Sequence, residues 1–149
     1  YRHYRRQSTY SALRNRNIYS YRTKNALAWA FDRCNYLTTE LTLMYDRQKA
    51  ESVLQSRLSG LTFIFEQKRP QKGRWQAFIE LDQVSVTPSG KAIPYEMSNG
   101  KKAGWTVGWG ISTEYRLGNN LTMRASYEGW REPLYPVYHL GSGEIRAYF

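Results

Sequence analysis

The chain has 149 residues, enough for one domain with a buried core, and its composition gives a net charge of +10 at pH 7. Aromatic residues make up 15% of the sequence, which excludes an intrinsically disordered segment, and the single cysteine, Cys34, excludes an internal disulfide bond. No apolar run approaches the about 18 residues that a transmembrane helix requires, so a helical membrane protein is excluded.

Residues 1–17 form a basic N-terminal segment with interleaved tyrosines, and the first acidic residue of the chain is Asp32. The basic residues that precede it are Arg2, Arg5, Arg6, Arg14, Arg16, Arg22 and Lys24. Such a segment suits a nucleic acid, an anionic lipid surface or an acidic partner. Residues 4–13 alternate weakly, so we expect the segment to be irregular or a weak first strand. Because the chain opens on Tyr1 instead of methionine, we expect a processed or partial chain.

Three stretches in the first part of the chain, 19–31, 37–45 and 74–82, alternate between apolar and polar residues with the period of two that is typical of a β-strand. Their large apolar residues fall on one side of each strand: Tyr19, Tyr21, Leu27, Trp29, Phe31, Leu37, Leu41, Leu43, Tyr45, Trp75, Ile79 and Leu81. Residues 56–65 also predict a strand, but apolar residues occupy both of its sides, so its orientation is ambiguous.

The alternation is clearest in 105–117 and 121–129, and it returns in the last segment, 141–149. In 105–117 the odd-numbered residues are mostly large and apolar, whereas the even-numbered residues are small or charged. All these strands follow one another without an intervening helical pattern, so the sequence predicts an antiparallel meander over residues 18–149.

The tight turn between 105–117 and 121–129 predicts the register of these two strands. If Leu117 opposes Leu121, Glu114 meets Arg124 across the ladder. A shift by two residues would place Arg116 against Arg124, and this like-charge contact disfavours the shift. The predicted register also places Ser112 opposite Ser126, and Trp109 over Gly129.

The connections alternate in length along the chain. The segments 31–35 and 117–121 are tight and contain the Asn and Gly residues that turns favour, and 66–74 falls with them although it is longer. We expect the longer connections at the opposite end of the meander: 46–53, 87–104 and 131–137.

Alternation alone fits either a soluble barrel with an apolar interior or a membrane barrel with an apolar exterior. The polar side of the strands favours the membrane barrel, because it carries small residues that a crowded lumen requires: Gly108, Gly110, Ser112, Ser126 and Ser142. The same side carries charges of both signs, which we expect to form a lumen charge network: Glu80, Asp82, Glu114, Arg116, Arg124, Glu128 and Arg146.

Large aromatic residues lie near the strand ends on the apolar side, where a lipid slab would meet water. We expect these residues to be membrane-interface aromatics: Phe31, Tyr45, Trp75, Trp105 and Tyr115. The fold class predicted from these patterns is all-β, an antiparallel up-and-down transmembrane β-barrel meander of seven or eight strands.

The last strand, which ends on Phe149, resembles the C-terminal strand of bacterial outer-membrane β-barrel proteins. In that family a terminal aromatic residue and the alternate residues before it help the barrel-insertion machinery to recognise the chain. Phe149 and Ile145 match this pattern, whereas Ala147 stands where a larger hydrophobic residue is commoner. The resemblance implies an insertion signal at Ile145, Ala147 and Phe149, and about 130 residues of strand-and-turn pattern before the last strand support it.

The resemblance also implies a location in the outer membrane of a Gram-negative-type bacterium, with a periplasmic C-terminus. The partners it implies are membrane lipids, lipopolysaccharide, the insertion machinery and other envelope proteins. On this basis we expect 87–104, with Lys91, Lys101 and Lys102, to face the medium or the phosphates of lipopolysaccharide.

Closure into a small barrel of eight strands would require residues 4–13 to pair with 137–149. The first of these stretches is polar on both sides and poorly suited to face lipid. We therefore favour the other possibility, that the chain is the closing part of a larger barrel.

Catalytic signals are few. His3, His139 and Cys34 lack metal-ligand spacing, and we expect no metal and no cofactor. A hydrolase or acyltransferase set of His139, Ser142 and Glu128 is disfavoured, because serine and glutamate recur throughout the polar side.

We expect a non-enzymatic function, either as a porin-like pore or transport component or as the membrane anchor of a larger envelope complex. The alternative is a soluble basic β-barrel domain that binds nucleic acid or another anionic ligand. The substrate, the strand number and the oligomeric state do not follow from the sequence.

Overall fold

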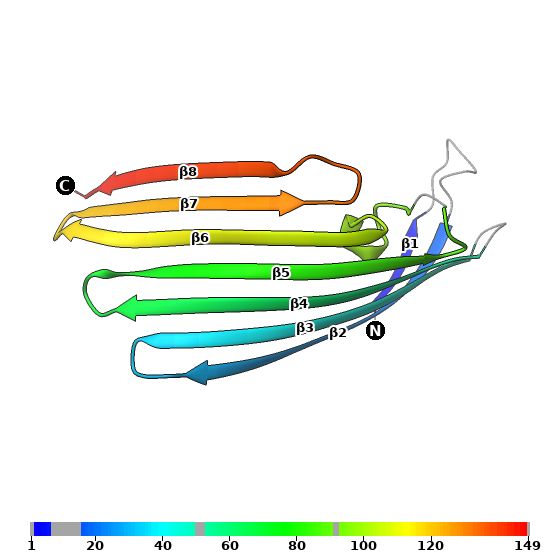
Figure 1. Ribbon diagram of the computed structural model, residues 1–149, viewed down its shortest axis with the longest axis horizontal. Helices are drawn as coiled ribbons and strands as arrows, with labels where there is room; N and C mark the ends of the chain where they lie inside the picture. Colours follow the sequence, from blue (N-terminus) through cyan, green and yellow to red (C-terminus); the bar gives the residue numbers. More distant parts are fainter. Residues whose placement is uncertain (1, 7–15, 50–52, 91–92, 149) are drawn as a thin grey trace.

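The computed structural model describes residues 2–6, 16–49, 53–90 and 93–148, and they form one antiparallel sheet in which every strand pairs with the next one along the chain (Figure 1). A short strand, β1, is followed by seven long ones. The strands are β1 (Arg2–Arg6), β2 (Arg16–Ala30), β3 (Asn35–Lys49), β4 (Leu54–Arg69), β5 (Gly73–Thr87), β6 (Gly104–Gly118), β7 (Leu121–Arg131) and β8 (Tyr138–Ala147). The predicted all-β, up-and-down meander is therefore confirmed.

The sheet is open. Among the described strands, β1 pairs with β2 and β8 pairs with β7, and these two outer strands do not meet. The possible small closed barrel is therefore wrong for the described residues. β1 is shorter than β2 and pairs with Arg16–Ser20 alone, so residues 21–30 of β2 have no partner strand on this side among the described residues. Most of the weak strand expected at 4–13 lies outside the described residues.

The β2–β3, β4–β5 and β6–β7 turns lie together at one end of the sheet and the other connections lie at the opposite end, as predicted (Figure 1). The expectation of a long connection at 46–53 is wrong, because β3 continues to Lys49 and β4 begins at Leu54. The turn between β4 and β5 is shorter than the sequence indicated, because the strands continue to Arg69 and resume at Gly73. In the turn between β2 and β3, the Asp32 carboxylate accepts hydrogen bonds from the backbone N–H groups of Cys34 (2.7 Å) and Asn35 (2.8 Å). These bonds, with one from the side chain of Asn35, hold the pKa of Asp32 below its ordinary value.

In all the ladders from β2 to β8, odd-numbered residues pair with odd-numbered residues and even with even, apart from one irregularity next to the β6–β7 turn. Since paired residues point to the same side of a sheet, the odd-numbered side chains of β2–β8 form one face and the even-numbered ones the other. We call them the odd face and the even face. The odd face is the predicted apolar side.

The even face is buried at the end with the long connections. A small core of Ile18, Leu54 and Met97 forms there, with Val86 and Ile93 packed against it. Met97 belongs to the β5–β6 loop, residues 88–103, which contains the short 3-10 helix η2 (Ser98–Gly100) and folds over the even face. This core explains the ambiguous alternation of 56–65, because β4 buries apolar residues on the even face here and presents others on the odd face.

The predicted register of β6 and β7 is confirmed for Glu114 with Arg124, for Ser112 with Ser126 and for Trp109 with Gly129. The starting assumption, Leu117 opposite Leu121, is wrong: Leu121 pairs with Gly118, and the register shifts between Arg116 and Gly118. The irregularity absorbs one residue next to the turn, so the rest of the ladder keeps the predicted pairing.

The indole of Trp109 covers Gly129 closely, and a Cβ atom at that position would lie 2.5 Å from the ring. We expect Gly129→Ala to lower the free energy of unfolding by about 1–3 kcal/mol, because the indole must leave its position. The matched control is Gly143→Ala on the same face of the next strand, where a Cβ atom would meet nothing within 4 Å. This control should be neutral or stabilising by about 0.5–1 kcal/mol. Urea unfolding measures the free energy of unfolding of each variant. Equal changes in the two variants would contradict the close packing of Trp109 on Gly129.

Candidate functional site

The candidate site is the even face, because the structure gathers the predicted charged residues there. All of them have even numbers and lie on strands β5–β8: Glu80, Asp82, Glu114, Arg116, Arg124, Glu128 and Arg146. Their position on one face follows from the register alone. Their role in lining a lumen stays a prediction.

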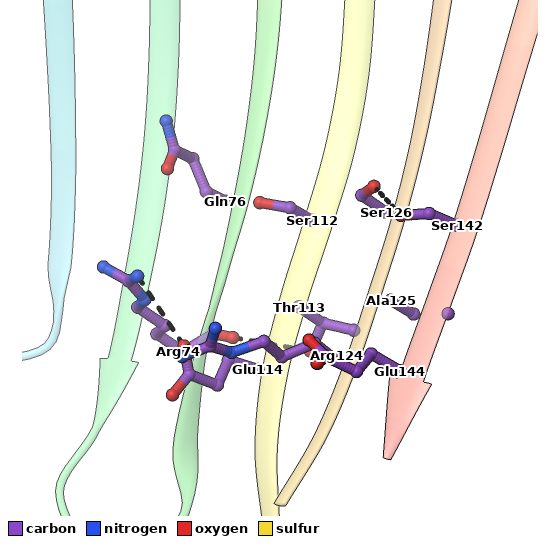
Figure 2. A pocket seen from close by; sticks show the side chains of 11 residues that line it. Arg74, Gln76, Ser112, Thr113, Glu114, Arg124, Ala125, Ser126, Ser142 and Glu144 are labelled. Carbon is purple, nitrogen blue, oxygen red and sulfur yellow. Dashed lines mark hydrogen bonds and ion pairs between the residues drawn. The ribbon is translucent and has the colours of Figure 1, made fainter. Parts of the chain in front are cut away.

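Glu114 is the centre of an ion-pair cluster near the tight turns. Its Oε2 lies 3.3 Å from Nε of Arg124 and 3.7 Å from an Nη atom of Arg74 (Figure 2). Next to the cluster, the hydroxyl groups of Ser126 and Ser142 share a hydrogen bond of 2.8 Å. These residues line a groove of about 490 Å³ across β5–β8. Arg74 joins the cluster although the sequence analysis did not select it.

The other predicted charges have different surroundings. Arg146 forms an ion pair with Glu144, at 2.7 Å between Nε and Oε1, and Glu144 faces Arg124 across the ladder. Glu128 lies opposite Gly110, whose missing side chain leaves room for the Glu128 side chain and for the ring of Phe78. A Cβ atom at Gly110 would lie 2.5 Å from that ring, so the even face is as crowded here as the small residues indicated.

Lys101 connects the β5–β6 loop to the even face. Its ammonium group bonds to a carboxylate oxygen of Glu80 at 2.5 Å and also to Asp82. The expectation that Lys101 faces the medium is therefore wrong, because the loop folds inward and two carboxylates attract the ammonium group. Lys102 stays exposed, with its ammonium group 3.5 Å from the centre of the Tyr135 ring, and Lys91 lies outside the described residues.

The Lys101 interactions persist to high pH. Burial opposes the charge on Lys101, but hydrogen bonds to Asp82 and Glu80 outweigh this effect and raise its pKa above the ordinary value of 10.5. A raised pKa in the folded state means that the contribution to stability is complete below the ordinary pKa and is lost only as the pH rises through the raised one. The loop is therefore held against the sheet at neutral pH.

Asp46 is a second attachment point for the loop, and the sequence pattern did not predict it. Its side chain is fully buried on the even face of β3, where Oδ2 accepts hydrogen bonds from the backbone N–H of Ser98 (2.6 Å) and the hydroxyl of Ser56 (3.3 Å). The sequence around Asp46 does not indicate that its partner, Ser98, lies 52 residues further along the chain.

The predicted interface aromatics lie at both ends of the odd face. Trp75 and Tyr115 lie near the tight turns, with Phe31 in the β2–β3 turn, whereas Tyr45 and Trp105 lie toward the long connections. The Trp75 indole donates to the amide oxygen of Gln67 at 2.8 Å, which gives its polar atom a partner. Their role at a membrane interface stays a prediction.

At the C-terminus, Ile145 and Ala147 lie on the odd face of β8, whereas Phe149 lies outside the described residues. The possible hydrolase set is not assembled. His139 lies on the odd face, with Nδ1 at 2.6 Å from the Tyr127 hydroxyl, whereas Ser142 and Glu128 lie on the even face. Within the described residues, no group of three His, Cys, Asp or Glu side chains is placed to hold a metal ion.

Comparison of the chain with protein-family models, with curated proteins and with solved structures finds no match. Of the helices in the described part of the chain, none is both long and apolar enough to span a membrane. The function is therefore inferred from the geometry of this chain.

We expect Lys101→Met to release the β5–β6 loop, because Glu80 and Asp82 would lose their cation inside a partly buried site. Hydrogen exchange of the backbone N–H groups of Ser98 and Lys101 should become at least about tenfold faster, which corresponds to about 1.4 kcal/mol of local stability. Lys102→Met is the matched control, since the Lys102 ammonium group contacts only the Tyr135 ring among the described interactions, and it should leave these rates unchanged. Equal hydrogen-exchange rates in the two variants would contradict the attachment of the loop through Lys101.

Proposed function

We propose that the chain forms the closing strands of a larger outer-membrane β-barrel, with the odd face against lipid and the even face lining the lumen. One observation carries the proposal: large exposed hydrophobic side chains of β2–β8 concentrate on the odd face. They are Tyr21, Leu27, Trp29, Leu41, Leu43, Phe63, Ile79, Trp105, Ile111, Tyr115, Leu117, Tyr127 and Ile145 on the odd face, against Tyr138 and Leu140 on the even face.

The position of the covering loop supports this orientation. In a water-soluble β-protein, the layer that covers a sheet buries its apolar face. Here the β5–β6 loop covers one end of the even face instead, where Met97 joins the small core and the loop bonds to Asp46, Glu80 and Asp82. The large hydrophobic residues of the odd face stay uncovered. An exposed apolar face of this extent is unusual for a soluble monomer and is what lipid contact requires.

The spacing of the aromatic residues fits the thickness of a membrane. Trp105 and Tyr115 are ten residues apart on β6, which is about 33 Å along the strand at about 3.3 Å per residue. A strand tilt of about 45° projects this separation to about 23 Å, close to the apolar band of about 25 Å on outer-membrane barrels.

The unpaired edges favour a larger barrel, in which this sheet is only one part. Residues 21–30 of β2 and the outer side of β8 have no neighbouring strand among the described residues. In lipid, each unsatisfied backbone group costs several kcal/mol, so both edges need partner strands. Further strands of the same barrel would provide them.

For the activity we propose transport of ions or small polar solutes. A membrane anchor needs no polar groove, whereas the even face has a groove next to Glu114 and charges of both signs, as a conducting lumen has. The β5–β6 loop would narrow this lumen near Glu80. Conductance in planar bilayers tests the activity, and a protein without conductance would favour the anchor role.

Cysteine labelling tests the orientation of the sheet. In a Cys34→Ser background, Ile111→Cys should be shielded by lipid, whereas Ser112→Cys on the opposite face should react with a small charged maleimide at least about tenfold faster. Adjacent positions on one strand make each variant the control of the other. Faster labelling of Ile111→Cys than of Ser112→Cys in native membranes would refute the proposed orientation. Recovery in the soluble fraction with salt-sensitive nucleic-acid binding would favour the soluble alternative.

Hydrogen exchange in β8 tests closure by further strands. In an antiparallel ladder only alternate N–H groups of a strand point toward a given neighbour. If an additional strand pairs with the outer side of β8, all N–H groups from Tyr138 to Ala147 should be protected in the full-length protein. Rapid exchange of alternate ones would indicate a free edge and contradict the larger barrel.

A further inference from the structure

A hollow of about 640 Å³ lies at the tight-turn end of the sheet, and its lining is strongly basic. The β2–β3 turn, the end of β4 and the strands β5–β7 contribute cationic residues to it: Arg33, Lys68, Arg69, Arg74, Arg116 and Arg124. Among the described residues that line it, Glu114 is the one carboxylate. The hollow lies apart from the loop-covered end of the even face, and it shares Arg74, Glu114 and Arg124 with the groove next to Glu114.

Existing ion pairs leave much of this charge uncompensated. Glu114 already contacts Arg74 and Arg124, and Lys68 pairs with Glu66 at 3.2 Å. In the described part of the chain, Arg33, Arg69 and Arg116 form no ion pair. Three unpaired guanidinium groups around one hollow repel one another, and a bound anion would remove that repulsion.

The shape and the donors indicate the class of the anion. Guanidinium groups present planar pairs of N–H donors that match the oxygens of phosphate and carboxylate. A volume of about 640 Å³ lies in the range of small-molecule sites, about 300–1,000 Å³, and exceeds the needs of a single monovalent anion. The hollow is also bounded by the β4–β5 turn, with Pro70 and Gln71 in its wall, which suits a compact solute.

We propose that this hollow binds a small solute that carries several oxyanion groups, with phosphates as the favoured case. Arg33, Arg69 and Arg116 bind the anionic groups, while Arg74 and Arg124 add positive potential from the even face. The hollow is present whichever face meets lipid, so this inference does not depend on the proposed function. In a barrel it would lie at the mouth on the tight-turn side and would concentrate anions there.

The test is calorimetric titration of the full-length protein with inorganic tripolyphosphate at low ionic strength, compared with orthophosphate. We expect tripolyphosphate to bind more tightly, and added salt to weaken its binding. The double variant Arg69→Gln and Arg116→Gln should lose at least about tenfold in affinity, because it removes two of the guanidinium groups that would bond to the anion. Absence of tripolyphosphate binding would overturn the proposal.

The control double variant is Arg22→Gln and Arg57→Gln, which removes the same charge outside the residues that line the hollow. It should retain the affinity, and an equal loss in both double variants would mean a non-specific response to net charge and would overturn the site. Vesicles of an anionic phospholipid provide a further arm. If these vesicles displace tripolyphosphate and neutral vesicles do not, the site binds a lipid headgroup, and the proposal of a small solute is overturned.

Discussion

The arrangement of residues in this protein depends on the pairing of odd-numbered with odd-numbered residues in the ladders from β2 to β8. A shift by one residue in any ladder would turn every side chain of the following strands to the opposite face. The pairing persists through turns and long connections alike, and even the irregularity beside Gly118 is confined to the turn. The seven long strands therefore present one face rich in large hydrophobic residues and one face that carries the charged residues of β5–β8 and the small core.

The β5–β6 loop then gives the two faces different surroundings. Met97 fills the small core at the end of the even face, and Lys101 and Ser98 attach the loop to carboxylates on three positions of the sheet, Asp46, Glu80 and Asp82. The loop thus covers a small apolar core and three carboxylates at one end of the even face, and it leaves the large hydrophobic residues of the odd face exposed. In a water-soluble sheet the face with more large hydrophobic residues is the covered one, and this difference is the physical basis of the proposed membrane orientation.

Much of the sheet could be predicted from the sequence because strand patterns are local. A period of two identified the long strands other than β4, whose alternation was ambiguous. The β6–β7 register was predicted from the tight turn, and the repulsion between Arg116 and Arg124 disfavoured a shift by two residues. The orientation of β4 could not be predicted, since its even-numbered apolar residues pack against Met97, which lies far along the chain. The inward fold of the loop was missed for the same reason: nothing in the sequence around Lys101 indicates which carboxylates it meets.

The hydrogen bond between Ser98 and Asp46 has a consequence for the order of assembly. Neighbouring strands are close in sequence, so the sheet can grow one hairpin at a time with little loss of chain entropy at each step. The partners of this hydrogen bond are 52 residues apart, and β3, β4 and β5 must be aligned before they meet. We therefore expect the loop to close late in folding, after the central strands have assembled.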